Sequence, residues 1–209
     1  MNKILAICTS PDKGGLELYF VKLINRYHKK TRNILALCRH ESLISKIINS
    51  PVINIKKINF INCWLQIFII LKSIKNENIN IIHVSWTNDL LLAVLIKIFS
   101  KRKIDIIYYR QMKITRNKKD IYHRFIYKNI SKVLVITKQL KSDCERYLPI
   151  PSNSIIHLKY GIEMPEIPDG NKKQSTFKKY NLSDKDFTIG VFSRIEEQKG
   201  QHLVIEALD

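Results

Sequence analysis

The chain has 209 residues, of which 45% are hydrophobic, and its formal net charge is +18. This length and hydrophobic content suit one domain with a real core plus a smaller remainder, and they exclude the disordered and fibrous classes. The positive charge favours an anionic partner, such as a phosphorylated ligand, an acidic membrane surface or nucleic acid. The abundance of Lys, Ile and Asn is also typical of an AT-rich coding bias, which raises the charge without selection for binding.

Short β-prone runs alternate with amphipathic runs from the N-terminus onward. The predicted strands span residues 4–8, 33–38, 52–55, 79–84, 104–109, 132–136 and 155–158. The predicted helices span residues 16–29, 41–49, 63–75, 89–99, 118–129 and 138–148. This alternation predicts an α/β fold with a doubly wound, mainly parallel, Rossmann-like sheet that is covered by helices on both faces.

The C-terminal part has a different organisation. Two prolines, a glycine and several polar residues between 164 and 175 are typical of an interdomain linker. After it, residues 187–192 read as a strand, 193–200 as a charged loop, and the residues from Gln201 onward as a helix. We therefore expect a first domain at 1–165, a linker and entry segment at 166–186, and at 187–209 the start of an incomplete second Rossmann-like domain.

Several classes of protein and site are excluded by what the sequence lacks. The cysteines are widely spaced, with no CxxC pair and no adjacent histidine, so no metal site is predicted and the thiols are expected to be reduced. No GxGxxG motif supports a dinucleotide cofactor, and no nucleic-acid-binding motif accompanies the positive charge. The apolar runs fall short of the roughly 20 residues that span a bilayer. We expect a cytoplasmic protein, with any membrane contact peripheral on the inner face of the cell membrane.

Two loops could bind an anion. Gly14 and Gly15 precede a predicted helix, so their backbone can approach a ligand closely while the helix N-terminus favours negative charge. Arg194, Lys199 and Gly200 occupy the same kind of place before the helix at Gln201. The alternative for the first loop is a flexible turn, and for the second an ordinary strand-to-helix turn with two solvated cations.

The sequence resembles family 4 retaining glycosyltransferases, through short motifs that cover nearly the whole chain. The matching motifs are Gly14-Gly15-Leu16-Glu17, Ile81-Ile82-His83, Val133-Leu134-Val135-Ile136-Thr137, Tyr160-Gly161-Ile162-Glu163, Ser193-Arg194, Lys199-Gly200 and Glu206-Ala207-Leu208. Tyr160 stands where the family usually has Asn. The resemblance implies two Rossmann-like domains that face each other across a cleft, with the acceptor bound mostly by the first and the donor mostly by the second.

The resemblance also implies a reaction and roles for residues. It implies sugar transfer from a nucleotide sugar to a saccharide or lipid-linked acceptor, with retained anomeric configuration and with no cofactor or obligatory metal. Arg194 and Lys199 would be the catalytic residues that hold the donor diphosphate, while Gly14, Gly15 and Gly200 would approach the donor through their backbone.

Two departures from the family limit the expected activity. Arg110 stands at the strand end where many members have a histidine, so it either takes that place or serves the acceptor. The family's characteristic pair of donor-binding glutamates is absent. We therefore expect a truncated, frameshifted or half enzyme with weak or no activity alone, whose donor domain could come from a separate chain.

A rival hypothesis is a binding module without chemistry, which docks on an anionic membrane surface or a charged acceptor. Basic residues in the segment 110–128 are interleaved with apolar ones, a mixture that suits such a surface. A solvated helix face would have the same pattern. The residues expected to face the acceptor or the membrane are Glu17, His83, Arg110, Lys113, Arg116, Lys118 and Lys119. His83 could equally be a structural imidazole.

Overall fold

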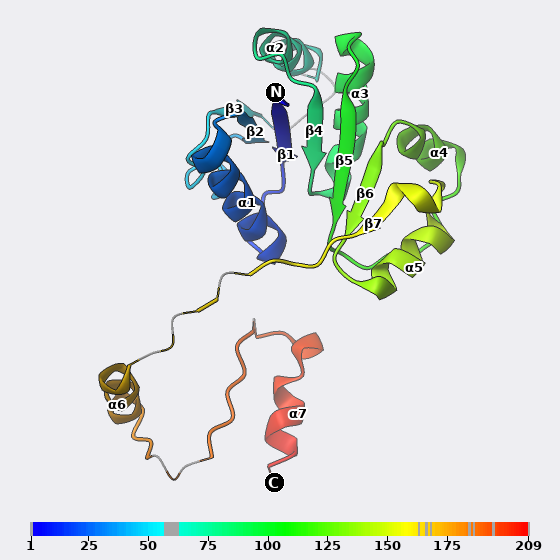
Figure 1. The fold of residues 1–209 in the computed structure, drawn as a ribbon. Coiled ribbons are helices and arrows are strands. Elements are labelled where there is room, and N and C mark those ends of the chain that lie inside the picture. The colour runs from blue at the N-terminus through cyan, green and yellow to red at the C-terminus, as the bar shows by residue number, and fades with distance from the viewer. Residues whose placement is uncertain are drawn as a thin grey trace. The chain divides into compact units, whose positions relative to one another are not determined.

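The computed structural model describes residues 2–56, 63–162, 164–165, 167, 169–183, 185, 187–193 and 195–208. The chain divides into two compact units, Met1–Gly161 and Ile162–Asp209. The first unit contains the sheet and the helices that pack on it (Figure 1). The second unit is described by itself below.

The first unit is built on a seven-stranded sheet in the order β3-β2-β1-β4-β5-β6-β7. Every pair of neighbouring strands is parallel. The strands are β1 (Ile4–Cys8), β2 (Ile34–Arg39), β3 (Val52–Ile55), β4 (Ile81–Val84), β5 (Asp105–Arg110), β6 (Lys132–Val135) and β7 (Ile155–His157). This confirms the predicted doubly wound parallel sheet, and each strand lies within two residues of its predicted bounds.

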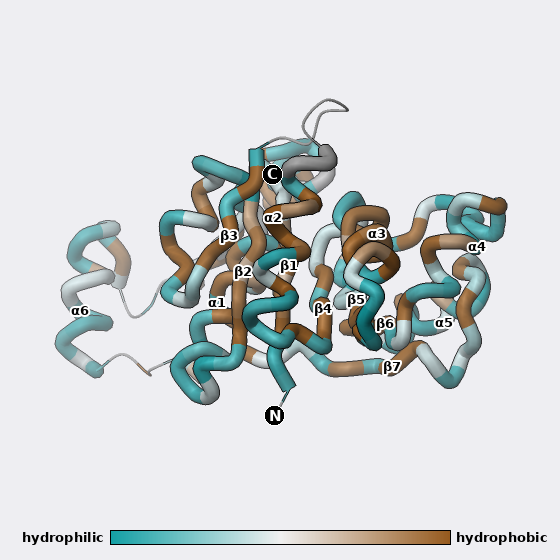
Figure 2. The backbone as a smooth tube through the Cα atoms, turned by 90° about the horizontal axis from the view of Figure 1, so that it is seen from above, coloured by the Kyte–Doolittle hydropathy of each residue, from teal (hydrophilic) through white to brown (hydrophobic). Residues whose placement is uncertain are grey.

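Helices cover both faces of the sheet. Successive strand residues point to opposite sides, and here the residues on both sides are apolar, so both faces are buried. In β1, Ala6 and Cys8 pack in one apolar cluster, together with Phe20 of helix α1 (Gly15–Thr31). Leu5 and Ile7 pack in the other cluster. That second cluster is formed with α2 (Cys63–Asn76), α3 (Leu90–Ser100), α4 (Ile121–Lys128) and α5 (Lys138–Tyr147). Figure 2 shows the hydrophobic residues running through the central strands β1 and β4.

Side-chain caps fix where α4 and α5 begin. The Asp120 carboxylate accepts a hydrogen bond from the amide of His123 at 3.1 Å, and the Thr137 hydroxyl accepts one from the amide of Leu140 at 3.0 Å. Such caps satisfy amides that would otherwise lack a partner at a helix N-terminus. They also hold the loops that precede these helices, and both loops leave the carboxyl edge of the sheet.

The predicted helix at 41–49 is wrong, because this segment forms turns. Ser45 donates its hydroxyl to the carbonyl of Ser42 at 2.7 Å, and Glu41 takes a left-handed conformation with φ of 60°. Serine side chains that bond to nearby backbone compete with helix formation. Ile44 and Ile48 still pack against the α1 cluster, so the apolar spacing reflected burial without a helix.

The second unit differs from its prediction in two ways. Residues 187–192 were predicted as a strand, but they form none. The reason is that an isolated apolar run needs a neighbouring strand, and the described part of this unit offers no strand to pair with. Helix α6 (Gly170–Lys179) lies inside the predicted linker, capped by Asp169. Helix α6 was not predicted because its sequence is almost entirely polar and shows no apolar periodicity. Helix α7 (Gln201–Glu206) forms as expected.

Candidate functional site at the carboxyl edge of the sheet

The strand order reverses between β1 and β4, which is where open α/β sheets have a crevice at their carboxyl edge. Helix α1 follows β1 onto one face of the sheet, whereas α3 follows β4 onto the other. Ligands of open α/β sheets bind beyond the carboxyl ends of the strands at such a reversal. Gly14 and Gly15 follow β1, and His83 lies near the end of β4, in register with Ala6 of β1. The structure therefore brings these predicted site residues to the same crevice.

A buried carboxylate joins the two loops that flank this crevice. Asp89 is 2% exposed, and its carboxylate accepts the amide of Thr9 at 2.9 Å and also the Thr9 hydroxyl. Burial raises the pKa of Asp89 to about 6, although the hydrogen bonds from Thr9 oppose that rise. Sequence reasoning missed this pair and used Asp89 only to mark the start of a helix. An acidic residue directly before an apolar helix was the available signal.

Glu17 forms a hydrogen bond that fixes the glycine loop at the start of α1. Its carboxylate accepts the amide of Gly14 at 2.9 Å, and its side chain is buried. A Cβ atom on Gly14 would lie 3.0 Å from the same carboxylate oxygen, whereas a Cβ on Gly15 would meet nothing within 4 Å. A side chain at position 14 would therefore press on the Glu17 carboxylate, whereas the space beside Gly15 is open. The Glu17 carboxylate is already engaged by the loop, which makes it a positioning group for Gly14.

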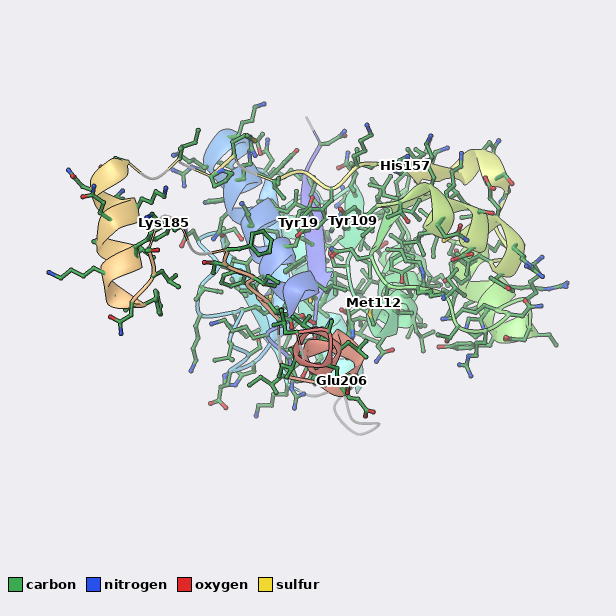
Figure 3. All side chains as sticks on the ribbon, turned by 90° about the horizontal axis from the view of Figure 1, so that it is seen from below. Tyr19, Tyr109, Met112, His157, Lys185 and Glu206 are labelled. Atoms are coloured by element: carbon green, nitrogen blue, oxygen red, sulfur yellow. The ribbon has the colours of Figure 1, made fainter. Side chains whose placement is uncertain are left out.

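Four rings form an aromatic cluster beside the crevice. Tyr19 of α1 stacks on Tyr109 of β5 with centroids 5.4 Å apart (Figure 3), and its ring lies tilted against that of Tyr160 with centroids 4.3 Å apart. His83 lies 6.1 Å from Tyr109. Burial raises the pKa of Tyr109, and the neighbouring Tyr19 raises it further. Aromatic faces of this kind can stack on a sugar or a base. Sequence reasoning found only His83 and Tyr160, because the stacking depends on strand register.

The imidazole of His83 is held neutral. Its side chain is half-buried, and Nδ1 is shielded from solvent with no hydrogen-bond partner among the described residues. Burial lowers the pKa of His83 to about 4. A neutral histidine can donate or accept one hydrogen bond through a ring nitrogen, so it suits a neutral hydroxyl better than an anion.

Arg110 faces away from His83. Register pairs His83 with Ile107, so Arg110, three residues further along β5, points to the opposite face of the sheet. Its guanidinium donates to the Tyr108 hydroxyl at 2.9 Å and to the carbonyl of Lys113 at 3.1 Å, and it is only 4% exposed. Arg110 therefore anchors the loop after β5. Sequence reasoning placed Arg110 and His83 together, and the structure separates them.

The loop after β5 holds the remaining basic residues of the first unit that were predicted to face an acceptor. Arg116 and Lys118 line a pocket of about 440 Å³ together with residues of α3 and α4. Lys113 and Lys119 are exposed in the same loop. The carbonyl of Lys119 accepts a hydrogen bond from Arg124 at 2.8 Å.

The second unit carries the predicted donor contacts. Lys199 is exposed and ends a short 3-10 turn, and Gly200 follows with φ of 70°, a left-handed conformation that favours glycine. The amide of Gly200 donates to the carbonyl of Glu197 at 3.0 Å. Arg194 lies outside the described residues. The approach of Lys199 to Gly14 and Gly15 across a cleft stays a prediction.

The described residues include neither a cluster of metal ligands nor a membrane-spanning helix. Within the described ranges, no group of three or more His, Cys, Asp or Glu side chains could hold a metal ion. No helix in the part of the chain that the structure covers is long and apolar enough to cross a bilayer. Cys8, Cys38 and Cys144 are free, buried thiols.

Comparison with known proteins relates the fold to several solved structures. No family model and no curated protein matches the sequence. A glycosyltransferase from Rickettsia africae superposes with a TM-score of 0.82 at 18% identity, over 99% of this chain and 56% of that one. Anabaena HepE in complex with UDP gives 0.74 at 15%, over 99% and 57%. Sucrose-phosphate synthase from Thermosynechococcus elongatus gives 0.63 at 12%, over 100% and 59%.

These likenesses concern the fold, because the identities are low. The chain spans less than two thirds of the length of each of these structures. The first unit thus has an α/β, Rossmann-like fold with a fully parallel sheet, and the chain shares its fold with over half the length of a glycosyltransferase.

Proposed function

We propose that this chain supplies the acceptor side, and the entry to the donor side, of a retaining glycosyltransferase of family 4 type. The enzyme would transfer a sugar from a nucleotide sugar to a saccharide or lipid-linked acceptor. The observation that carries the proposal is the reversal of strand order between β1, which leads into Gly14 and Gly15, and its neighbour β4, which carries His83, in a fold shared with a glycosyltransferase. Support for a nucleotide-sugar donor comes from HepE, which was crystallised with UDP and with UDP-glucose.

The chemistry follows from the charge that develops as the glycosidic bond breaks. The departing diphosphate gains negative charge, and fixed cations and backbone amides stabilise that charge without reorganising during the reaction. Arg194, Lys199 and the backbone at Gly200 are the proposed donors on one side. Exposed Gly15, with open space beside it, is the proposed place of close approach on the other side. No metal is required in this scheme, because the cations take its place.

The aromatic cluster and Asp89 give the acceptor side its rigidity. The Thr9–Asp89 hydrogen bonds and the Gly14–Glu17 cap fix the loop after β1 at both ends. The Tyr19 ring, which is partly exposed and stacks on buried Tyr109, is apolar, and neutral His83 beside Tyr109 is a neutral hydrogen-bonding group. Those properties suit a sugar ring with its hydroxyls better than a charged ligand.

Sugar transfer is the direct test. The chain would be incubated with a panel of nucleotide sugars and saccharide acceptors, first alone and then joined to or mixed with a donor half. We expect weak or no transfer by the chain alone, and transfer when the donor half is supplied. The proposal fails if the completed protein neither binds a nucleoside diphosphate nor turns over any nucleotide sugar.

A second candidate function is a binding module on an anionic membrane surface. The specific observation is a set of exposed apolar side chains near the basic loop after β5. Met112 is 60% exposed, Ile121 is 88% and Phe125 is 45%. Peripheral membrane binding combines such side chains with Lys and Arg. Liposome sedimentation with and without acidic lipid tests this function, and binding that ignores lipid charge would count against it.

A further inference from the structure

A basic pocket lies on the α3 and α4 side of the sheet, where the chain leaves β4 and β5. Its volume is about 440 Å³. Its lining combines polar and basic residues with the apolar residues Leu90, Leu91 and Ile126. The polar and basic lining residues are Thr87, Asn88, Arg116, Lys118, Tyr122, His123 and Tyr127. The pocket therefore offers charged and polar groups for an anion and apolar side chains for the group that carries the anion.

The two cations that line this pocket, Arg116 and Lys118, do not form ion pairs with carboxylates among the described residues. The nearby carboxylate of Asp120 is engaged by Nδ1 of His123 at 2.5 Å. Burial lowers the pKa of Lys118, and the positive charges of Arg110 and Arg116 lower it further, while the carboxylate of Asp120 opposes this change. Cations crowded in this way are stabilised when an anion binds between them.

Neutral hydroxyl groups also line the pocket or lie beside it. The Tyr108 hydroxyl accepts a hydrogen bond from Arg110 at 2.9 Å and shares another with the Thr87 hydroxyl, 2.7 Å away, in which either oxygen can be the donor. Thr87 lines the pocket, and a hydroxyl can donate to an anion there. Tyr127 is 1% exposed, and its hydroxyl has no hydrogen-bond partner among the described residues. A buried hydroxyl without a partner is costly, and an oxyanion that reaches it would remove that cost.

We propose that this pocket binds the phosphate group of a phosphorylated acceptor. Two cations and neutral hydroxyl groups line the pocket, a combination that suits phosphate oxygens. The apolar lining residues suit the remainder of the acceptor, either a soluble sugar phosphate or the headgroup region of a phospholipid. The identification of the phosphate carrier as an acceptor rests on the proposed transferase function. The binding of phosphate itself does not depend on that function.

The test uses the 209-residue chain itself and inorganic phosphate as the probe. Phosphate is titrated by calorimetry at constant ionic strength, with chloride as the competing anion. Lys118→Gln and Arg116→Gln each remove one pocket cation, and Lys128→Gln removes an exposed cation of α4 that does not line the pocket. We expect each pocket variant to weaken phosphate binding on the order of 10-fold, because charge-assisted hydrogen bonds are lost. Lys128→Gln should change it less than about 2-fold.

Two further probes distinguish the sources of the phosphate. Glucose 1-phosphate represents a soluble acceptor, and phosphatidylcholine vesicles with and without phosphatidic acid represent a lipid. One of these probes should bind more tightly than inorganic phosphate and lose that binding in Lys118→Gln. The probe that does so identifies the source of the phosphate. Phosphate binding no stronger than that of chloride, or an equal loss in Lys128→Gln, would overturn the proposal. Thermal unfolding of each variant checks that it is folded. The transfer assay can succeed even if phosphate does not bind, so failure of this proposal is distinguishable from failure of the proposed function.

Discussion

The backbone amide of Thr9 and its hydroxyl both donate to the buried carboxylate of Asp89, which ties the loop after β1 to the start of α3. The two loops come from strands that are neighbours in the sheet and distant in sequence. This contact lies directly at the crevice where the helices leave for opposite faces. It fixes the position of the glycine loop before any ligand arrives.

Asp89 predicts a pH dependence of stability. Its pKa in the folded protein is about 6, above the ordinary 3.8, so the folded state favours the protonated form. The stability that this group contributes is therefore complete below pH 3.8 and is lost as the pH rises through 6. The difference is at most about 3 kcal/mol. Urea unfolding of the wild type at pH 4 and pH 7, compared with Asp89→Asn, measures it.

The matched control is Asp12→Asn, which changes an exposed aspartate of the same loop. It should leave the pH dependence of the wild type in place. Identical pH profiles for the wild type and Asp89→Asn would show that Asp89 does not titrate in this window.

His83 predicts the opposite trend at a similar pH. Its pKa in the folded protein is lowered to about 4 from the ordinary 6.5, so the folded state favours the neutral ring. Stability from this group is present above pH 6.5 and is lost as the pH falls through 4. An NMR titration of the ring protons should give a midpoint near 4. A midpoint near that of exposed His40, measured in the same spectra, would contradict the shielding of the His83 ring from solvent.

The two glycines of the first loop should respond differently to substitution. Gly14→Ala places a Cβ 3.0 Å from the Glu17 carboxylate, which disrupts the cap of α1 and should cost about 1 kcal/mol of unfolding free energy. Gly15→Val meets open space, so stability should change by less than about 0.5 kcal/mol. Under the proposed function, Gly15→Val should nevertheless weaken UDP binding by the completed protein. Thermal unfolding and a UDP titration of both variants test the pair, and equal effects on stability would refute the distinction.

The sheet could be predicted from the sequence because each strand is a short apolar run between polar turns. Residues 41–49 were misassigned because apolar spacing alone does not report the serine hydrogen bonds that form the turns there. Helix α6 was missed for the opposite reason, since its residues are almost all polar and its start depends on the Asp169 cap. Hydrogen bonds of single side chains determine the structure of both segments. Such hydrogen bonds do not produce a periodic pattern in the sequence.

The candidate site was predictable only where it follows the chain order. Gly14 and His83 were found because loops after neighbouring strands gather at one edge. The stack of Tyr19 on Tyr109 and the opposite orientations of His83 and Arg110 depend on strand register, which a single sequence does not give. The Thr9–Asp89 contact joins residues 80 positions apart, so no local pattern could reveal it.

The kinetics of Lys199→Ala in the completed two-domain protein test the central claim most directly. If Lys199 stabilises charge that grows on the departing diphosphate, its loss should lower turnover on the order of 100-fold while the affinity for nucleoside diphosphate changes much less. Arg194→Ala should behave in the same way. Lys185→Ala removes an exposed cation of the same unit and should leave both quantities near the wild-type values. Normal turnover in Lys199→Ala and Arg194→Ala would contradict the account, and it would leave these two residues as solvated cations on a turn.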